Sequence, residues 1–369
     1  MKRLARGMCI VIGMLAMVGG APRYGDHQDL MYWIDEKGER HEVRTREDWL
    51  KRREHVLEAV KLVMGEMPKR EKVPLEMKEE EEAAVGELKR LKISYRTDAK
   101  TRVGAYLFIP PIAAGKKAPG ILCLHQTTNI GKMEPAGLGP KVNLHYALHL
   151  ASRGYVTLAP DYPSFGEYKY DFKDPEYASG SMKAICDNIR AVDLLVSLPE
   201  VDGERLGCIG HSLGGHNAIF TAVFEPRLKA IVSNCGFTSF PKYYGGKLKG
   251  WTSDRYMPRI ASIYNNDPKQ VPFDFPELIG ALAPRAFLAI APMRDDNFEH
   301  SGVDDCMAGA KPIYGLYGAG ENLAVEHPDC AHDFPEASRK IAYEFFDRHL
   351  KKPSPRPSPG VPGEGESGK

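Results

Sequence analysis

One serine of this chain stands in a setting that could make it a nucleophile. Ser212 lies in the motif Gly210-His211-Ser212-Leu213-Gly214, between an apolar run, Leu206–Ile209, and a segment with helical periodicity, Asn217–Phe224. A G-x-S-x-G motif between strand and helix is typical of a tight turn whose glycines remove clashing side chains. The serine hydroxyl then points out beside the N-terminal amides of the helix, a position suited to attack on a carbonyl group. A phosphate-binding or purely structural turn is also compatible with five such residues, so Ser212 needs partners.

A serine nucleophile requires a base, and the base requires a carboxylate that orients it. His332 is the expected base because it lies in the loop between the last predicted strand and the last predicted helix, and His327 is the second choice. The carboxylate is either Asp295 or Asp296, since both directly follow a predicted strand. One of these two residues could instead cap a helix.

Negative charge that develops on the attacked carbonyl oxygen needs two backbone N–H donors, the oxyanion hole. Leu213, at the start of the helix after Ser212, is expected to supply one donor. The other donor is expected from the loop after the apolar run Gly120–Leu124, with Thr127 as first choice and Gln126 as second.

The elements that must position these residues alternate between strand and helix. Strands spaced by helices predict an α/β fold with a mostly parallel sheet and helices on both faces. Two earlier strands, Leu88–Tyr95 and Val103–Ile109, predict an antiparallel hairpin that leads into the sheet. The later strands are expected at Gly120–Leu124, Tyr155–Ala159, Leu206–Ile209, Leu228–Val232, Phe287–Ala291 and Ala319–Val325, and the main helices at Asn143–Ser152, Ser179–Leu198 and Glu336–Leu350.

The chain divides into one large domain and several smaller segments. Residues 87–351 are expected to form the α/β domain, with residues 237–282 as a small cap inserted over the site. Residues 22–86 are expected to pack on the domain through a helix at Asp48–Met67, and the acidic run Glu79–Glu82 is interpreted as a solvated face or loop. The other two segments lie at the ends of the chain: residues 1–21 resemble a signal peptide, and the Pro-, Gly- and Ser-rich residues 352–369 predict a disordered tail.

Composition and motifs narrow the classes of partner. A signal peptide implies a secreted or periplasmic protein without a membrane span after cleavage, where Cys306 and Cys330 could pair. The net charge of +1 argues against nucleic acid. No cofactor or metal is expected, because His145 and His149 lack the glutamate of a zinc motif. His216 is expected on a helix in a surface or packing role.

The motifs together resemble the α/β-hydrolase superfamily, in particular the dienelactone hydrolase and acetylxylan-esterase-like group, with kinship to the prolyl oligopeptidase catalytic domain. The resemblance extends over residues 88–350 and implies that the first aspartate of such a pair orients the histidine, which favours Asp295 over Asp296. It departs at the loop His125-Gln126-Thr127, where many such esterases have His-Gly-Gly. The matching motifs are Leu124-His125-Gln126, Gly154-Tyr155-Val156, Ala159-Pro160-Asp161-Tyr162, Gly210-His211-Ser212-Leu213-Gly214-Gly215, Arg294-Asp295-Asp296-Asn297 and His332-Asp333-Phe334.

The function predicted from these residues is hydrolysis of carboxylic esters through an acyl-enzyme, with Ser212, His332 and Asp295 as a catalytic triad. Export favours small-molecule or carbohydrate esters, such as acylated carbohydrates, as substrates. Two alternatives stay open: a serine peptidase of the prolyl oligopeptidase type, and a binding protein with a hydrolase fold that does not turn over substrate.

Overall fold

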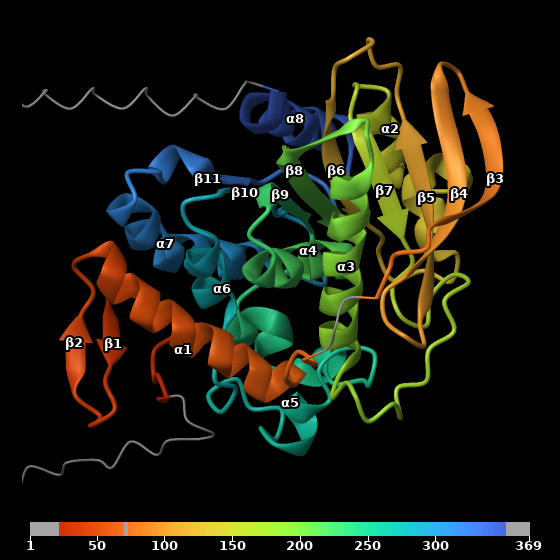
Figure 1. The fold of residues 1–369 in the computed structure, drawn as a ribbon. Coiled ribbons are helices and arrows are strands. Elements are labelled where there is room, and N and C mark those ends of the chain that lie inside the picture. Colours follow the sequence, from red (N-terminus) through yellow and green to blue (C-terminus); the bar gives the residue numbers. More distant parts are fainter. Residues whose placement is uncertain (1–21, 70–72, 352–369) are drawn as a thin grey trace, which may run out of the picture.

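A nine-stranded sheet forms the centre of the molecule, a computed structural model that describes residues 22–69 and 73–351 (Figure 1). Its strands are β3 (Lys78–Val85), β4 (Leu88–Arg96), β5 (Arg102–Ile109), β6 (Ala118–Leu124), β7 (Val156–Pro160), β8 (Val201–His211), β9 (Leu228–Asn234), β10 (Ala286–Ile290) and β11 (Leu323–Glu326). They lie in the order β11-β10-β9-β8-β6-β7-β5-β4-β3. The strands from β11 to β7 run parallel, whereas β5, β4 and β3 are antiparallel to their neighbours. The predicted fold class, a mostly parallel sheet entered from an antiparallel hairpin, is therefore confirmed.

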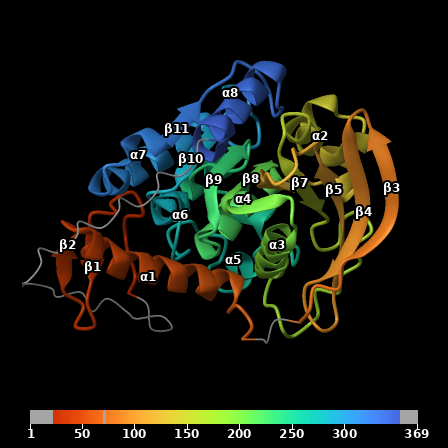
Figure 2. The same cartoon turned by 45° about the horizontal axis from the view of Figure 1, so that its top comes forward.

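Helices cover both faces of this sheet, as Figures 1 and 2 show from two directions. Helices α2 and α8 lie on one face, and α3, α4, α6 and α7 lie on the other, next to α1 and the short α5. The helices are α1 (Arg46–Met64), α2 (Tyr146–Ala151), α3 (Gly180–Ser197), α4 (Leu213–Phe224), α5 (Arg259–Ser262), α6 (Phe275–Leu282), α7 (His300–Leu316) and α8 (Glu336–Phe346).

Two hydrophobic cores, one on each face, join the sheet to the helices. Strand β5 shows how the sequence divides between them, because successive side chains of a strand point to opposite faces. Val103, Ala105 and Leu107 belong to the core beneath α3 and α4, whereas Tyr106 and Phe108 belong to the core beneath α2 and α8. A strand that is apolar on both faces is a buried strand, which explains the nearly continuous apolar runs in the sequence.

The sheet begins earlier than the sequence indicated. The acidic run Glu79–Glu82 lies in strand β3, which pairs with β4 along its whole length, and the expected boundary at residue 87 falls after this strand. The first five side chains of β3 are exposed, because β3 is an outer strand of the sheet and its glutamates face solvent. A strand without an apolar face carries no period-two signal, so the pattern did not reveal it.

The segment expected to form a cap has two parts. Residues 240–251 form two short 3₁₀ helices, at Phe240–Gly245 and Leu248–Trp251, and α5 follows. The end of the segment is helix α6, which packs against α4 and α7 within the helical layer and lies under the sheet rather than over the site. A covering role therefore remains a prediction for residues 237–274.

The N-terminal segment is attached to the domain through a buried ion pair. Arg52 of α1 has no solvent-exposed surface and donates a hydrogen bond to Glu277 of α6, which is also buried. The Arg52 guanidinium also lies over the ring of Tyr24, and Glu277 accepts a second hydrogen bond from His27. Residues from two parts of the segment, its start and α1, thus converge on α6, close to the short hairpin of β1 (Tyr32–Ile34) and β2 (Arg40–Glu42).

Replacement of Glu277 by leucine is expected to lower the free energy of unfolding by about 3–5 kcal/mol, because Arg52 is then left buried and unpaired. The double variant Arg52→Met/Glu277→Leu is expected to recover the part of this loss that comes from the unpaired Arg52, whereas His27 and the Asp274 amide still lack the carboxylate that they bond to. Urea unfolding followed by fluorescence measures both values.

A matched control is Glu58→Ala, which removes the exposed ion pair with Lys61 on the same helix and should change stability by less than about 1 kcal/mol. If Glu277→Leu were as stable as the control, the ion pair would not hold the segment in place.

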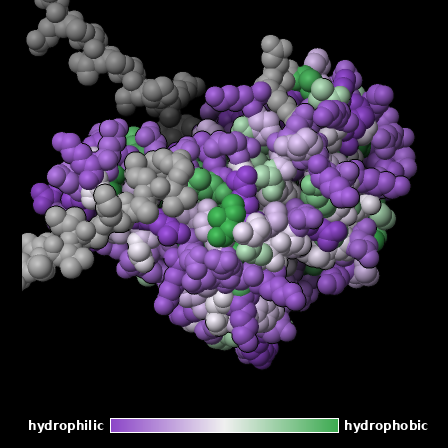
Figure 3. All heavy atoms as spheres, turned by 90° about the horizontal axis from the view of Figure 1, so that it is seen from below, coloured by the Kyte–Doolittle hydropathy of each residue, from purple (hydrophilic) through white to green (hydrophobic). Residues whose placement is uncertain are grey.

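No helix within residues 22–69 and 73–351 is long and apolar enough to cross a bilayer. The face seen in Figure 3 is mostly hydrophilic, with hydrophobic residues in small separate patches. The predicted signal peptide, residues 1–21, and the predicted tail, residues 352–369, lie outside the described residues.

Candidate active site

Ser212 occupies a strained turn between strand β8 and helix α4. Its backbone has φ of 56° and ψ of −118°, a conformation that a residue with a side chain rarely adopts. A Cβ atom on Gly210 would lie 2.1 Å from the backbone of Gly214, and one on Gly214 would lie 1.9 Å from the carbonyl oxygen of Leu124. These glycines are therefore required by the close approach of strand, turn and helix.

The backbone around Ser212 leaves the amide of Leu213 available to a substrate. Leu213 is the first residue of α4, and the first N–H groups of a helix have no acceptor within it. The Ser212 carbonyl accepts from Gly215 and His216 one turn later, at 2.8 and 3.3 Å, so the helix is regular from its start. The geometry thus suits the predicted role of Leu213 as an oxyanion donor.

A pocket of about 70 Å³ opens beside Ser212. Thr127 lies in its wall together with Ser212 and Leu213, and the Thr127 hydroxyl is 3.0 Å from that of Tyr256. Gln126 instead directs its side-chain amide to Glu134, at 3.1 Å, on the other side of the loop. The structure brings Thr127 to the pocket, and the choice between the backbone amides of Thr127 and Gln126 stays a prediction. The remaining lining residues are His216, Tyr243, Gly250, Trp251, Tyr256, Asn297 and Phe298.

His332 and Asp295 form a hydrogen-bonded pair near this pocket. Nδ1 of His332 lies 2.9 Å from both carboxylate oxygens of Asp295, whose side chain has no solvent-exposed surface. Burial alone would raise the pKa of Asp295, but the hydrogen bonds from His332 and from the amides of Phe298 and Asn297 lower it below its ordinary value. An ionised carboxylate accepts only, so Nδ1 carries the proton and Nε2 of His332 is left as a base.

The alternative residues lie elsewhere. Asp296 is exposed and is not hydrogen-bonded to His332. Nδ1 of His327 donates to the carbonyl of Ala291, at 2.9 Å, and its Nε2 lies 2.8 Å from a carboxylate oxygen of Asp304, so both ring nitrogens are engaged. The geometry therefore groups Asp295 with His332, and the catalytic roles of the two residues remain predictions.

The ring of His332 is held between two others. Its centroid lies 4.7 Å from that of His211, which precedes Ser212, and 6.1 Å from that of Phe298 in the pocket wall. The described hydrogen bonds do not include one between Ser212 Oγ and His332, a contact that in hydrolases often forms only with substrate bound. His211 is itself buried, and burial lowers its pKa well below the ordinary value, so it packs as a neutral ring.

Cys235 is a neighbour of this pair that the sequence did not reveal. It follows β9 and has a φ of 48°, and its thiol donates a hydrogen bond to the carbonyl of Asp333, at 3.5 Å, while lying beside the carboxylate of Asp295. Burial, and next the negative charge of Asp295, raise the pKa of this thiol, so it stays protonated beside the carboxylate. Its position directly after the strand that follows the serine motif was the available signal.

The donor atoms of Cys235, Asp295 and His332 lie within 4.8 Å of one another, a spacing that could also hold a metal ion. A protonated thiol and a carboxylate already shared by His332 and two amides are poor metal ligands. The set therefore fits the orientation of a histidine better than a metal. Cys306 and Cys330 are both free thiols, so the disulfide considered from the sequence is not formed.

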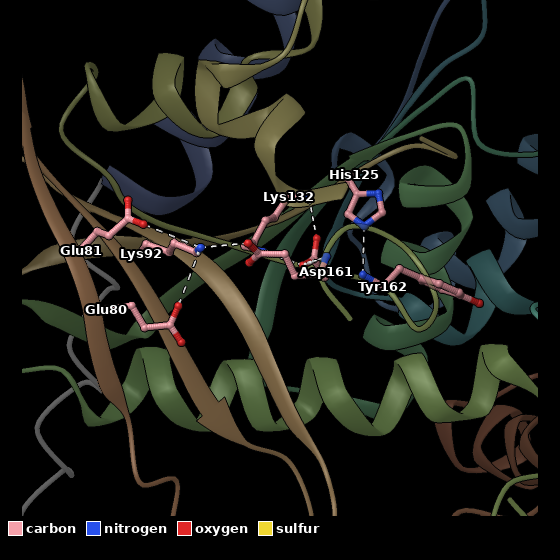
Figure 4. A network of polar contacts seen from close by, with 8 residues as sticks. Glu80, Glu81, Lys92, His125, Lys132, Asp161 and Tyr162 are labelled. Carbon is pink, nitrogen blue, oxygen red and sulfur yellow. Dashed lines mark hydrogen bonds and ion pairs between the residues drawn. The ribbon is translucent and has the colours of Figure 1, made fainter. Parts of the chain in front are cut away.

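The loop that carries Thr127 is fixed from behind by a polar network that extends to the outer strands (Figure 4). His125 accepts a hydrogen bond from the amide of Tyr162 through Nε2, at 2.9 Å, and donates from Nδ1 to the carbonyl of Gln126. Burial lowers the pKa of His125, in agreement with this neutral form. His125, the residue that this loop shares with the His-Gly-Gly motif, thus has a structural role and joins the loop after β6 to the loop after β7.

The same network contains a buried lysine. Lys132 lies 2.6 Å from Asp161 and 2.7 Å from Glu167, and its hydrogen bond, the largest effect, lowers the pKa of Glu167 to about 2. Lys92 of β4 binds the other oxygen of Glu167 at 2.9 Å and also contacts Glu80 and Glu81 of β3. The loops after β6 and β7 are therefore joined to the antiparallel edge of the sheet.

His216 has a different position from the one expected. It belongs to α4, yet it is buried and lines the pocket beside Ser212. Its Nδ1 lies 3.0 Å from the carbonyl oxygen of Gly236, which can only accept, so Nδ1 carries the proton. The expected surface role of His216 is therefore wrong, and its ring both packs inside the protein and lines the pocket.

Known structures share this fold over most of the chain. A glucuronoyl esterase from Solibacter usitatus superposes with a TM-score of 0.69 at 19% identity, covering 89% of this chain and 98% of that one. A putative acetyl xylan esterase from Bacteroides fragilis superposes with a TM-score of 0.60 at 16% identity, covering 87% and 93%. The chain has the α/β-hydrolase fold.

Sequence comparison agrees with this fold. Residues 140–301 match the prolyl oligopeptidase family, a range that contains the serine motif and Asp295. A putative hydrolase of Bacillus subtilis, YtaP, is 25% identical over 304 residues, which are 78% of this chain and 96% of that protein. The resemblance found from the motifs is thus confirmed at the level of the superfamily.

Proposed function

We propose that this α/β-hydrolase cleaves carboxylic esters through an acyl-enzyme on Ser212. The observation that carries the proposal is the strained turn, which presents Ser212 at a pocket beside Leu213 and Thr127, near a histidine paired with a buried aspartate. The names of similar proteins, glucuronoyl esterase and putative acetyl xylan esterase, support ester substrates. A strained serine conformation would be an unexplained cost in a protein that only binds.

The proposed chemistry follows from the tautomer of His332, in which Nδ1 carries the proton and Nε2 does not. Its free Nε2 removes the proton of Ser212 as Oγ attacks the ester carbonyl, and the Leu213 and Thr127 amides bind the oxyanion. His332 then gives the proton to the leaving alcohol, and an acyl-serine remains. Water, deprotonated by the same nitrogen, attacks the acyl-serine, and the acid and free Ser212 result. Asp295 stabilises the imidazolium in both halves of the reaction.

A fluorophosphonate probe is expected to label the intact protein at Ser212 and to leave the Ser212→Ala variant unlabelled, because only an activated serine reacts with it at a useful rate. Peptide mapping by mass spectrometry locates the label. Absence of labelling in the wild type, or equal labelling of both proteins, would refute the proposed nucleophile.

A carbohydrate ester substrate outside the cytoplasm is the finer form of this proposal. It rests on the resemblance of residues 1–21 to a signal peptide and on the printed names of the similar esterases. A peptidase is the second candidate, because residues 140–301 match the prolyl oligopeptidase family. Acetylated sugars, aryl esters and peptide amides, assayed side by side, separate the two candidates by which class gives the higher kcat/KM.

A further inference from the structure

Two buried polar atoms in the wall of the pocket have no partner. They are Nε2 of His216 and Nε1 of Trp251, and both residues line the same pocket as Ser212. Their rings meet edge to face with centroids 4.7 Å apart. A buried polar atom without a hydrogen bond costs about 1–3 kcal/mol, so a protein rarely leaves two together without something to bind there.

The chemistry of the two atoms is complementary. Nδ1 of His216 donates to the Gly236 carbonyl, and burial lowers the pKa of this histidine to about 3, so Nε2 is an unprotonated acceptor at neutral pH. The indole nitrogen of Trp251 carries a hydrogen and can only donate. One acceptor and one donor together match a hydroxyl group, which both donates and accepts.

The rest of the wall contains three more aromatic rings and the neutral polar side chains of Thr127, Ser212 and Asn297, and it carries no formal charge. The rings of Tyr243 and Phe298 lie 5.5 and 6.0 Å from that of Trp251, and the ring of Tyr256 lies 6.1 Å from that of His216. None of the residues that line the pocket is a lysine, arginine or carboxylate. The volume, about 70 Å³, exceeds the roughly 10–15 Å³ that one water needs, so a group of several heavy atoms fits.

We propose that this pocket binds a neutral, hydroxyl-bearing part of the substrate, such as one edge of a sugar unit, with hydroxyl hydrogen bonds to His216 Nε2 and Trp251 Nε1. The inference rests on the proposed ester hydrolysis and adds to it the class of group recognised beside the serine. A substrate that lacks the hydroxyl leaves both atoms unpaired and is discriminated against, whereas the aromatic rings pack on the carbon skeleton in either case.

The test compares substrates that differ only in a hydroxyl. One series has it on the acyl side, as glycolate against propionate esters of the same phenol. The other has it on the alcohol side, as an acetylated methyl xylopyranoside against its deoxy analogues. In at least one series the wild type is expected to prefer the hydroxylated member by about tenfold or more in kcat/KM, the worth of about one hydrogen bond.

Variants then assign this preference to the two atoms. His216→Leu and Trp251→Phe are each expected to reduce the ratio of the two kcat/KM values severalfold toward one, and His216→Gln, which keeps an acceptor, to restore part of it. Phe220→Leu is the matched control, because Phe220 packs on the ring of His216 at 5.5 Å but does not line the pocket. This control is expected to retain the wild-type ratio.

A wild-type ratio near one in both series would overturn the inference, as would a ratio that neither His216→Leu nor Trp251→Phe changes; the two atoms would then bind only water. Failure of the proposed function looks different, since the wild type would then hydrolyse none of the esters or do so equally well as Ser212→Ala. Thermal unfolding of each variant verifies that the ratios are measured on folded protein.

Discussion

Replacement of Ser212 by alanine is expected to lower kcat for an aryl acetate by about 10⁶-fold, because the acyl-enzyme can no longer form. The residual rate should stay above that in water, since the Leu213 and Thr127 amides and the pocket are left in place. Initial rates under saturating substrate, with the enzyme concentration raised for the variant, measure the effect. Alanine keeps the Cβ atom and therefore the same backbone strain at φ 56°, so the stability of the fold is expected to be unchanged.

Ser152→Ala is a suitable control. The hydroxyl of this exposed serine donates to the carbonyl of Leu148 at the C-terminal end of α2, and the residue does not line the pocket beside Ser212. Its kcat should equal that of the wild type. A Ser212→Ala variant that retained more than a hundredth of wild-type activity would place the nucleophile elsewhere.

Replacement of Asp295 by asparagine is expected to lower kcat by about 10⁴-fold. Both carboxylate oxygens of Asp295 face Nδ1 of His332. In the asparagine variant an amide N–H group can face the N–H group of Nδ1, or favour the tautomer of His332 whose proton is on Nε2. The imidazolium that forms during attack would also lose its counter-charge. The same variant should react with a fluorophosphonate more slowly than the wild type, whereas KM should change little.

Asp296→Asn is the matched control for Asp295→Asn. The two aspartates are neighbours, but Asp296 is exposed and is not bonded to His332, so this variant should keep its activity within about a few-fold of the wild type. A larger loss in Asp296→Asn than in Asp295→Asn would reverse the assignment of the acid.

The sequence predicted those parts of the molecule that carry a local signal. The parallel strands are continuous apolar runs, and the serine motif requires its glycines because an added Cβ atom would come as close as 1.9 Å to the neighbouring backbone. The order of Ser212, Asp295 and His332 followed from the ends of predicted strands, and the structure brings the last two together. Their catalytic roles await the measurements above.

What the sequence did not predict depends on contacts between distant residues. Cys235 and His216 have ordinary local contexts, and only the fold carries one to Asp295 and the other into the pocket beside Ser212. Arg52 and Glu277 are separated by 225 positions, so no local pattern could pair them. Strand β3 was not predicted because its consecutive glutamates lack the alternation of apolar and polar residues that is typical of a strand.

The glutamates of β3 have a consequence for the protein at high concentration. An outer strand offers free backbone N–H and C=O groups, to which the strand of another molecule can add. A second copy that approached β3 with its own β3 would bring Glu79–Glu82 of both chains together, and like charges on facing strands repel. The sheet therefore ends in a strand that disfavours the addition of further strands from other molecules. The glutamates that make β3 difficult to recognise in the sequence thus also reduce the tendency of the folded protein to aggregate.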